Sequence, residues 1–255
     1  MIRALLVTVL LALSACAPSS PLPDMQPGET GRVTRIIDGD ALVLDTGQSV
    51  RLVSIEAPAM YPQAGSPAPY AGESARRLED MALGRQVQLF YPGLTRDRYD
   101  RALAHVVTID GAGPQLWLNM EMIDAGAAWV RLYPSTSARG RDLLARENEA
   151  RIARQGLWAR SDYAMRSPEQ VAIDAQGFFF VSGALGPTQP IPEETRYPPA
   201  CLRGFEGAAL TLSVRRDAAT ACGLADGTQV LVRGRVSNGA LDLSHPFHLT
   251  EIEPD

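Results

Sequence analysis

The sequence contains no lysine, so all 24 of its basic residues are arginine. Two explanations stay open: an arginine-rich genome composition, or a preference for arginine as a phosphate ligand. Histidine and cysteine are also scarce, at three residues each among 255. Their positions give no group with the spacing of a zinc site. A formal net charge of −5 gives no general case for binding nucleic acid through overall charge.

The hydrophobic content of 45% and aromatic content of 6% are typical of a globular protein. The charge is distributed unevenly along the chain. Residues 31–166 carry 17 arginines against 16 acidic residues, whereas residues 167–255 carry 6 arginines against 11 acidic residues. Any contact with a polyanion is therefore expected in the first of these two segments.

The N-terminus has the pattern of an export signal. Arg3 precedes an apolar run over residues 4–13, which is too short for a typical membrane-spanning helix. The run leads to Leu13-Ser14-Ala15-Cys16, which resembles a bacterial lipobox. We expect residues 1–15 to be a lipoprotein signal peptide and Cys16 to carry the lipid that anchors the chain to a membrane. A plain secretory signal with an incidental cysteine is the alternative.

An alanine follows Cys16, and in a Gram-negative bacterium this residue would favour sorting to the outer membrane on the periplasmic side. Residues 16–30 are rich in proline and serine and are expected to form a flexible tether. Export would place Cys201 and Cys222 in an oxidising compartment. Their separation of about twenty residues then favours a disulfide.

The periodicity of residues 31–162 predicts a mainly β domain with helices. Turn signals separate three strands, a helix, two strands and two helices, which is the order of a five-stranded Greek-key barrel, the OB-fold. The expected strands cover residues 32–37, 41–45, 49–55, 86–91 and 102–109, and the expected helices cover residues 72–83, 118–125 and 137–155.

A linker over residues 163–175 is expected to lead to a second β domain over residues 176–255. Its strands are expected at residues 177–183, 209–215, 229–236, 240–243 and 245–252. Asn238-Gly239 is a strong hairpin signal between two of them. A small barrel or sandwich fits this pattern, and a second barrel of the first type is one version of it. His245 and His248 receive no functional assignment.

Four charged side chains in the first domain suggest phosphate chemistry. Asp40 and Glu56 lie in the segment VTRIIDGDALVLDTGQSVRLVSIEAP together with Arg51, and Arg101 ends the motif DRYDR. Carboxylates hold divalent cations, and the arginine fork matches a phosphate. These are the minimum components for cutting a phosphodiester bond.

Six motifs extend this pattern along residues 32–159, namely RIIDGDALVL, RLVSIEAP, YAGESARRL, TRDRYDRALAHV, LNMEMIDAGAAWV and ENEARIARQGLWA. In this order and spacing they resemble the staphylococcal nuclease (thermonuclease) family. The resemblance implies an OB-fold with three helices and calcium-dependent hydrolysis of DNA or RNA.

The resemblance also implies roles for individual residues. Calcium would be held by Asp40, Glu56 and the backbone carbonyl of Ala57. Arg51 and Arg101, with Glu56, would act in catalysis by stabilising the charge of the transition state. Arg98 and Tyr133 would contact a nucleotide phosphate.

Three positions depart from the family pattern. Ala59 stands where the family has an acid that acts on the attacking water, and losing such a base costs about 10²–10⁴ in rate. Ala41 replaces a threonine, and Asp100 replaces a glycine and places an acid beside Arg101. Glu56 or Glu73 would then have to assist the water.

Three hypotheses follow. The first is an exported, lipid-anchored, calcium-dependent nuclease with reduced activity. The second is a non-catalytic module of the cell envelope that uses the barrel to bind nucleic acid, peptide or protein. The third is a structural lipoprotein whose barrels are assembly surfaces.

Overall fold

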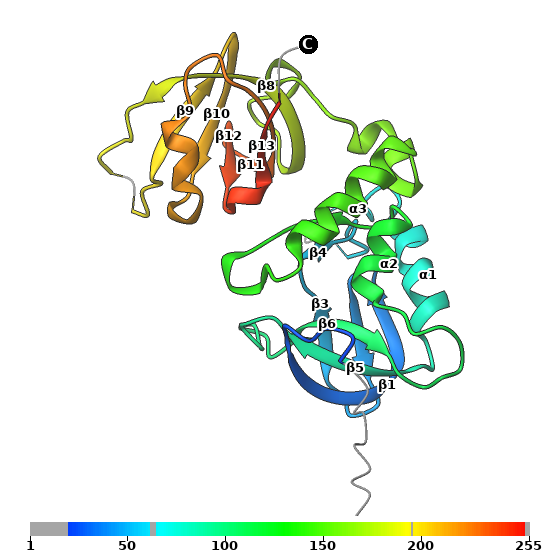
Figure 1. Cartoon of the computed structure of the whole chain (residues 1–255). Coiled ribbons are helices and arrows are strands. Elements are labelled where there is room, and N and C mark those ends of the chain that lie inside the picture. Colours follow the sequence, from blue (N-terminus) through cyan, green and yellow to red (C-terminus); the bar gives the residue numbers. More distant parts are fainter. Residues whose placement is uncertain (1–19, 62–64, 195, 253–255) are drawn as a thin grey trace, which may run out of the picture.

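The computed structural model describes residues 20–61, 65–194 and 196–252, and it contains two β-barrels that follow one another along the chain (Figure 1). The expected signal peptide over residues 1–15 and the expected lipid attachment site at Cys16 lie outside the described residues. Among the described residues, no helix has the length and apolar character needed to cross a membrane.

The first barrel confirms the predicted OB-type architecture. Its closed strand order is β1 (Gln26–Asp38), β2 (Ala41–Leu44), β3 (Ser49–Leu52), β6 (Ala102–Thr108) and β5 (Gln86–Tyr91). The β3–β6 pair is parallel, and the other neighbours are antiparallel. Figure 1 shows the helices gathered at one end of this barrel, and they are α1 (Ala71–Ala82), α2 (Leu118–Asp124) and α3 (Gly140–Ile152).

Alternating side chains explain why these short segments become barrel strands. In β5, Val87 and Leu89 are fully buried, whereas Gln86 and Gln88 between them are half-buried. The buried set packs against apolar residues of the helices, such as Leu78 of α1. Strand alternation and helix periodicity therefore converge on one core.

The expected tether over residues 16–30 is wrong for its second half. β1 begins at Gln26, which pairs with Tyr91 of β5. Leu22 and Met25 are 3% and 6% exposed and pack with Phe90. Burial of these two apolar side chains and the pairing of β1 with β5 both hold the segment against the barrel.

The second barrel has the same strand order as the first. Its six-stranded sheet runs β12-β10-β9-β8-β11-β13, and an additional β11–β12 pairing closes a ring of five strands. The β10–β12 pair is parallel, like β3–β6 in the first barrel. The strands are β8 (Gly177–Gln189), β9 (Cys201–Phe205), β10 (Ala208–Val214), β11 (Gln229–Ser237), β12 (Ala240–Leu243) and β13 (Leu249–Glu251).

Two expectations for this region were wrong. β9 was not predicted, because its short sequence CLRGF contains a charged residue and a glycine and follows a proline-rich loop. The single strand expected over residues 245–252 is instead a 3-10 turn, η6 (Pro246–His248), followed by β13. Part of the expected linker also belongs to the second barrel, since Val171 is buried in its core.

Cys201 of β9 and Cys222 form a disulfide in the second barrel, with their Cα atoms 6.0 Å apart. The bond closes a loop with a sequence separation of 21 residues. Closing such a loop restricts the unfolded chain.

Replacing both cysteines by alanine is therefore expected to lower the free energy of unfolding of the second barrel by about 3 kcal/mol. Urea unfolding of the variant and of the unaltered chain, each with and without a reducing agent, measures this difference. The prediction fails if the reductant shifts both proteins equally.

Two buried histidines make stability depend on pH. His105 of β6 accepts a hydrogen bond from the Trp117 indole at 3.1 Å, and His248 accepts one from the Leu132 amide at 2.9 Å. Burial lowers the pKa of each to about 3. The unfolded chain binds these protons near pH 6.5, so stability is full above that pH and is lost as the pH falls toward 3.

Lowering the pH from 7 to 5 is expected to cost about 2 kcal/mol for each of these histidines. Urea unfolding at both pH values measures the loss, and His105→Gln is expected to make the pH dependence shallower. An identical pH dependence in the variant would contradict the assignment.

Candidate active site

A pocket of about 490 Å³ opens beside the first barrel and collects most of the predicted catalytic side chains. Arg51 comes from β3, Arg101 from the loop before β6, and Glu56 from β4 (Ile55–Glu56). Tyr133 also lines the pocket and follows β7 (Trp129–Val130). Glu56 and Tyr133, which are 77 positions apart in sequence, thus share one cavity only because β7 pairs with β4.

The β2–β3 hairpin sets Asp40 beside Arg51. The strand register places Ala41 opposite Arg51, so Asp40, the residue before Ala41, lies next to the guanidinium. Arg51 Nη1 is 2.5 Å from Asp40 Oδ1, and Asp40 Oδ2 accepts a hydrogen bond from the Ala57 amide at 2.6 Å. The Asp40 side chain is 1% exposed and that of Arg51 is 24% exposed. One end of the arginine therefore neutralises a buried acid while its other side faces the pocket.

The electrostatics of this pair follow from burial. Burial raises the pKa of Asp40 well above its ordinary value, and the Arg51 charge opposes that rise. Burial acts to lower the pKa of Arg51, but the carboxylates of Asp40, Glu56 and Asp38 raise it above its ordinary value. Arg51 therefore stays cationic.

Close packing fixes the turn that carries Asp40. A Cβ at Gly39 would lie 1.8 Å from Ser74 Oγ on α1, so only glycine fits here. Ser74 Oγ in turn donates to the carbonyl of Ala127 at 2.6 Å. The turn, α1 and the segment before β7 are thereby held together.

Asp97 holds Arg101 in place. Its Oδ1 accepts the backbone N–H groups of Tyr99 and Arg101 at 2.9 and 3.0 Å, and its Oδ2 accepts from Arg101 Nε at 2.8 Å. Burial acts to raise the pKa of Asp97, but these bonds lower it below its ordinary value. The carboxylate thus orients the arginine toward the pocket, a role that the sequence pattern did not reveal.

Asp100 occupies a left-handed backbone conformation with φ of 59°. Aspartate tolerates this region better than most residues, which accounts for an acid at a position where the resembled family has glycine. Its exposed carboxylate lies 3.8 Å from Arg96. The acid that the sequence places beside Arg101 is thus paired with Arg96, and the carboxylate that contacts Arg101 is Asp97.

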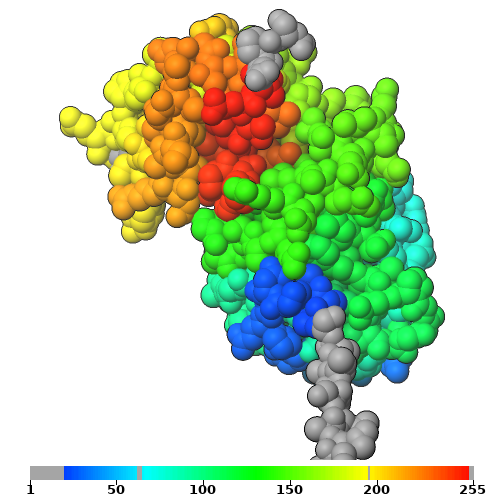
Figure 2. Space-filling model, viewed as in Figure 1, coloured from blue at the N-terminus to red at the C-terminus, as the bar shows by residue number. Residues whose placement is uncertain are grey.

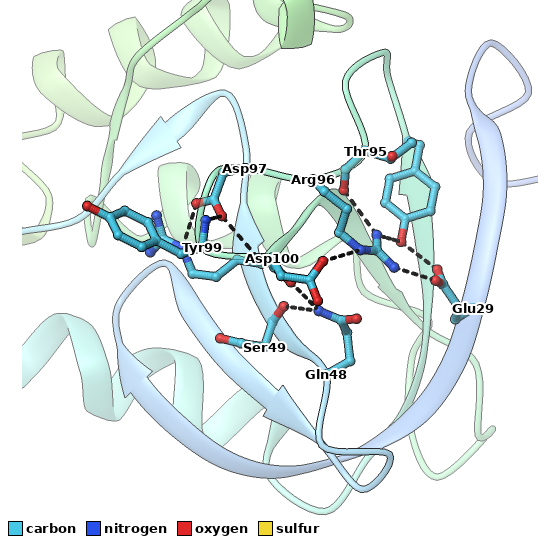
Figure 3. Close-up of polar contacts among 10 residues, drawn as sticks. Glu29, Gln48, Ser49, Thr95, Arg96, Asp97, Tyr99 and Asp100 are labelled. Atoms are coloured by element: carbon cyan, nitrogen blue, oxygen red, sulfur yellow. Dashed lines mark hydrogen bonds and ion pairs between the residues drawn. The ribbon is translucent and has the colours of Figure 1, made fainter.

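Figure 3 shows how this loop is anchored from outside the pocket. Arg96 donates to Glu29 of β1 and to the Tyr91 hydroxyl, each at 2.6 Å. Gln48 donates to the carbonyl of Asp100 at 3.0 Å. The loop is thus tied to two strands of the barrel, so Arg101 projects from a fixed base.

Arg131 is a pocket residue that sequence reasoning missed. It forms an ion pair with Glu56, and its guanidinium carbon lies 5.2 Å from the centre of the Tyr133 ring. Pairing of Glu56 with Trp129 between β4 and β7 produces this contact. Burial raises the pKa of Tyr133 above its ordinary value, with Arg131 opposing the rise, so the phenol stays neutral near pH 7.

The remaining predicted residues lie elsewhere. Arg98 is exposed and stacks on Tyr99, with its guanidinium carbon 4.8 Å from the ring centre, and it does not line the pocket. Ala59 is exposed and also does not line it. Glu73 borders a separate surface groove with Arg76 and Arg77, so the suggestion that it assists the water is not supported.

The residues implied as calcium ligands fit an oxygen-bound cation in part. Asp40 Oδ1 is a buried oxygen without a hydrogen bond among the described residues, but Arg51 Nη1 lies 2.5 Å from it and would compete with a cation. Glu56 contributes a second carboxylate, but Arg131 competes for it. The described part of the chain holds no group of three or more histidine, cysteine or acidic side chains arranged for a metal. The carbonyl of Ala57 and water would have to complete the shell that calcium requires.

Part of the sequence that forms the first barrel and its pocket is similar to known proteins. The profile of the staphylococcal nuclease homologue family matches residues 49–160. The thermonuclease of Staphylococcus intermedius is 26% identical over 136 residues, which cover 52% of this chain and 78% of that protein. The thermonuclease of Staphylococcus hyicus is 24% identical over 139 residues, which cover 51% of this chain and 76% of that protein. Residues 49–160, which supply most of the pocket, therefore form a staphylococcal nuclease-like segment.

Proposed function

We propose that this pocket binds and slowly hydrolyses phosphodiester bonds of single-stranded DNA or RNA with calcium as its cofactor. The observation that carries the proposal is that Arg51 and Arg101 line the same cavity from different elements. Two bidentate guanidinium groups can hold the charge that gathers on the phosphoryl oxygens in the transition state. The match to the nuclease family supports the same reading.

Each pocket residue has a role in this proposal. Arg51 and Arg101 hold the phosphoryl oxygens, and Tyr133 donates a hydrogen bond from a neutral phenol. Asp40, Glu56 and the carbonyl of Ala57 would hold calcium, which when bound polarises a phosphoryl oxygen. Glu56 is the pocket carboxylate that can take a proton from the attacking water, since position 59 is alanine.

Glu56 is a poor substitute for a dedicated base because Arg131 is paired with it. The ion pair occupies one of the two Glu56 carboxylate oxygens, which is then not free to accept a proton from the attacking water. We therefore expect turnover about 10²–10⁴ below that of an enzyme with a free base at this place.

We also propose that the chain is exported and lipid-anchored through Cys16, which would place the pocket in the periplasm of a Gram-negative bacterium. The lipobox-like sequence before Cys16 supports this, and the disulfide at Cys201 and Cys222 suits an oxidising compartment. Incorporation of labelled fatty acid, lost in Cys16→Ala, tests it.

A second candidate function is binding without catalysis. It is favoured by the pairing of both candidate metal ligands with arginines, Asp40 with Arg51 and Glu56 with Arg131. Such a pocket would hold a phosphate in a nucleic acid without cutting it. The experiment below separates the two functions.

Cleavage of single-stranded DNA is measured with the chain lacking its first 16 residues, in calcium and in chelator. Arg101→Ala is expected to abolish calcium-dependent cutting. The matched control is Arg216→Ala, which removes an exposed arginine of the second barrel away from the pocket. If the chain binds DNA without cutting it, the binding function replaces the hydrolytic function. If the chain neither binds nor cuts DNA, both proposed functions are rejected.

A further inference from the structure

The second barrel contacts the pocket wall formed by residues 129–133, which we call the 129–133 segment. Figure 2 shows the surface of the second barrel, in orange and red, meeting the green surface of the first unit. On its other side the segment supplies Arg131 and Tyr133 to the pocket. One stretch of chain therefore lies between the second barrel and the candidate active site.

An ion pair buried between the barrels fixes the middle of this segment. Glu147 of α3 accepts the Val130 amide at 2.7 Å with one carboxylate oxygen, and its other oxygen pairs with Arg233 of β11. The side chains of Glu147 and Arg233 are 1% and 6% exposed. Separating this pair would leave an uncompensated charge buried, which is strongly destabilising. The pair therefore holds the segment in one position.

Two further contacts flank the ion pair. The Leu132 amide donates to His248 Nε2 of the second barrel at 2.9 Å. The Trp129 ring stacks on Phe178 of β8 with centroids 5.7 Å apart. Consecutive residues of the segment are thus bound by side chains from the second barrel.

Phe178 also reaches Arg131 directly. The guanidinium carbon of Arg131 lies 5.7 Å from the centre of the Phe178 ring and 5.2 Å from the centre of the Tyr133 ring. Cation–π contacts of this kind restrict the side chain and leave its N–H groups available. Among the guanidinium nitrogens of Arg131, only Nη1 makes a hydrogen bond within the described residues, to Glu56. The other donors of the fork can serve a phosphate.

We propose that Arg131 is a third phosphate-binding residue of the pocket and that the second barrel positions it through Phe178, Arg233 and His248. This inference rests on the proposed function, because it assumes that the pocket binds nucleic-acid phosphates. It assigns the second barrel a role in the site of the first: without these contacts the 129–133 segment would hold Arg131 less rigidly, and affinity would fall.

Fluorescence anisotropy of a short labelled single-stranded DNA, recorded in chelator over a range of salt concentrations, tests the proposal on the chain lacking its first 16 residues. Arg131→Ala is expected to weaken binding about tenfold and to lower the slope of log affinity against log salt by about 0.7, the value for one phosphate contact on a single strand. Phe178→Leu is expected to produce part of both changes.

The matched control is Phe179→Leu, the next residue on β8, whose ring faces Arg166 and the core of the second barrel instead. It is expected to change stability but not the salt slope. In the double variant, Phe178→Leu is expected to add little to Arg131→Ala, because both act through the same guanidinium.

Equal salt slopes in the Phe178 and Phe179 variants, or additive effects in the double variant, would overturn the positioning role. An unchanged slope in Arg131→Ala would overturn its role as a phosphate ligand. Weaker binding in Arg51→Ala beside an unaffected Arg131→Ala rejects this inference alone. If the unaltered chain binds no DNA, the proposed function fails together with the inference.

Discussion

Arg51→Ala is expected to lower the turnover of a single-stranded DNA substrate by about 10²–10³-fold in calcium. Arg51 lines the pocket from the β3 strand, together with Arg101 from the loop before β6. Removing it deletes a preorganised bidentate donor for the charge that develops on the phosphoryl oxygens. Initial rates at saturating substrate measure the loss.

The same substitution also has a structural effect that the experiment must separate. Asp40 is 1% exposed and would lose the positive charge 2.5 Å from its Oδ1. Arg51→Lys is the matched variant, because a lysine keeps a charge for Asp40 but cannot form the planar fork. We expect Arg51→Lys to keep most of the thermal stability while losing most of the activity.

A second result would show that loss of activity reflects the pocket and not the fold. Arg216→Ala, far from the pocket, is expected to keep full turnover. If Arg51→Lys cut DNA as fast as the unaltered chain, the bidentate role of Arg51 would be wrong. Equal losses of activity in the Arg216 and Arg51 variants would point to unfolding or to a site elsewhere.

Glu147→Gln is expected to lower the free energy of unfolding by about 3–5 kcal/mol, the largest effect on stability that we predict. The substitution leaves Arg233, 6% exposed, buried between the barrels without its partner charge. Differential scanning calorimetry or urea unfolding measures the change.

Glu149→Gln is the matched control on the same helix. Glu149 pairs with Arg146 on the surface and is 65% exposed, so its loss is expected to cost well under 1 kcal/mol. Replacing both Glu147 and Arg233 by apolar residues is expected to recover part of the loss, because no charge is then left buried. The Val130 amide would still lack its acceptor. Equal costs for the Glu147 and Glu149 variants would show that the buried pair is not important for stability.

The sequence alone predicted those features whose cause is local. The strand 86–91 and the strand 240–243 were placed with their observed ends, because alternation of apolar residues between turn signals is a short-range property. The contact of Asp40 with Arg51 was not predicted, although its cause is also local, since a hairpin brings together residues that are close in sequence. Recognition of the nuclease-like segment required only motif order.

Other local patterns were misleading. Residues 20–30 had the composition of a tether, yet Leu22 and Met25 are buried against the barrel. Asp100 was expected to weaken Arg101, but the turn directs its carboxylate toward Arg96. Local composition indicates only the conformation that a segment prefers in isolation. The packing of Leu22 and Met25 and the contact of Asp100 with Arg96 depend instead on other parts of the folded chain.

The sequence by itself determined the order of the strands in the first barrel and the nuclease-like segment, and it named Arg51 and Arg101 as candidate site residues, which line one pocket. Only the tertiary structure decided that Arg131 joins Glu56 across 75 residues, that Arg233 meets Glu147 across 86, and that His248 meets Leu132 across 116. The physical reason is range. Backbone propensity and hydrophobic alternation act over a few residues, but contacts between residues so far apart in sequence form only after the fold has brought their surfaces together.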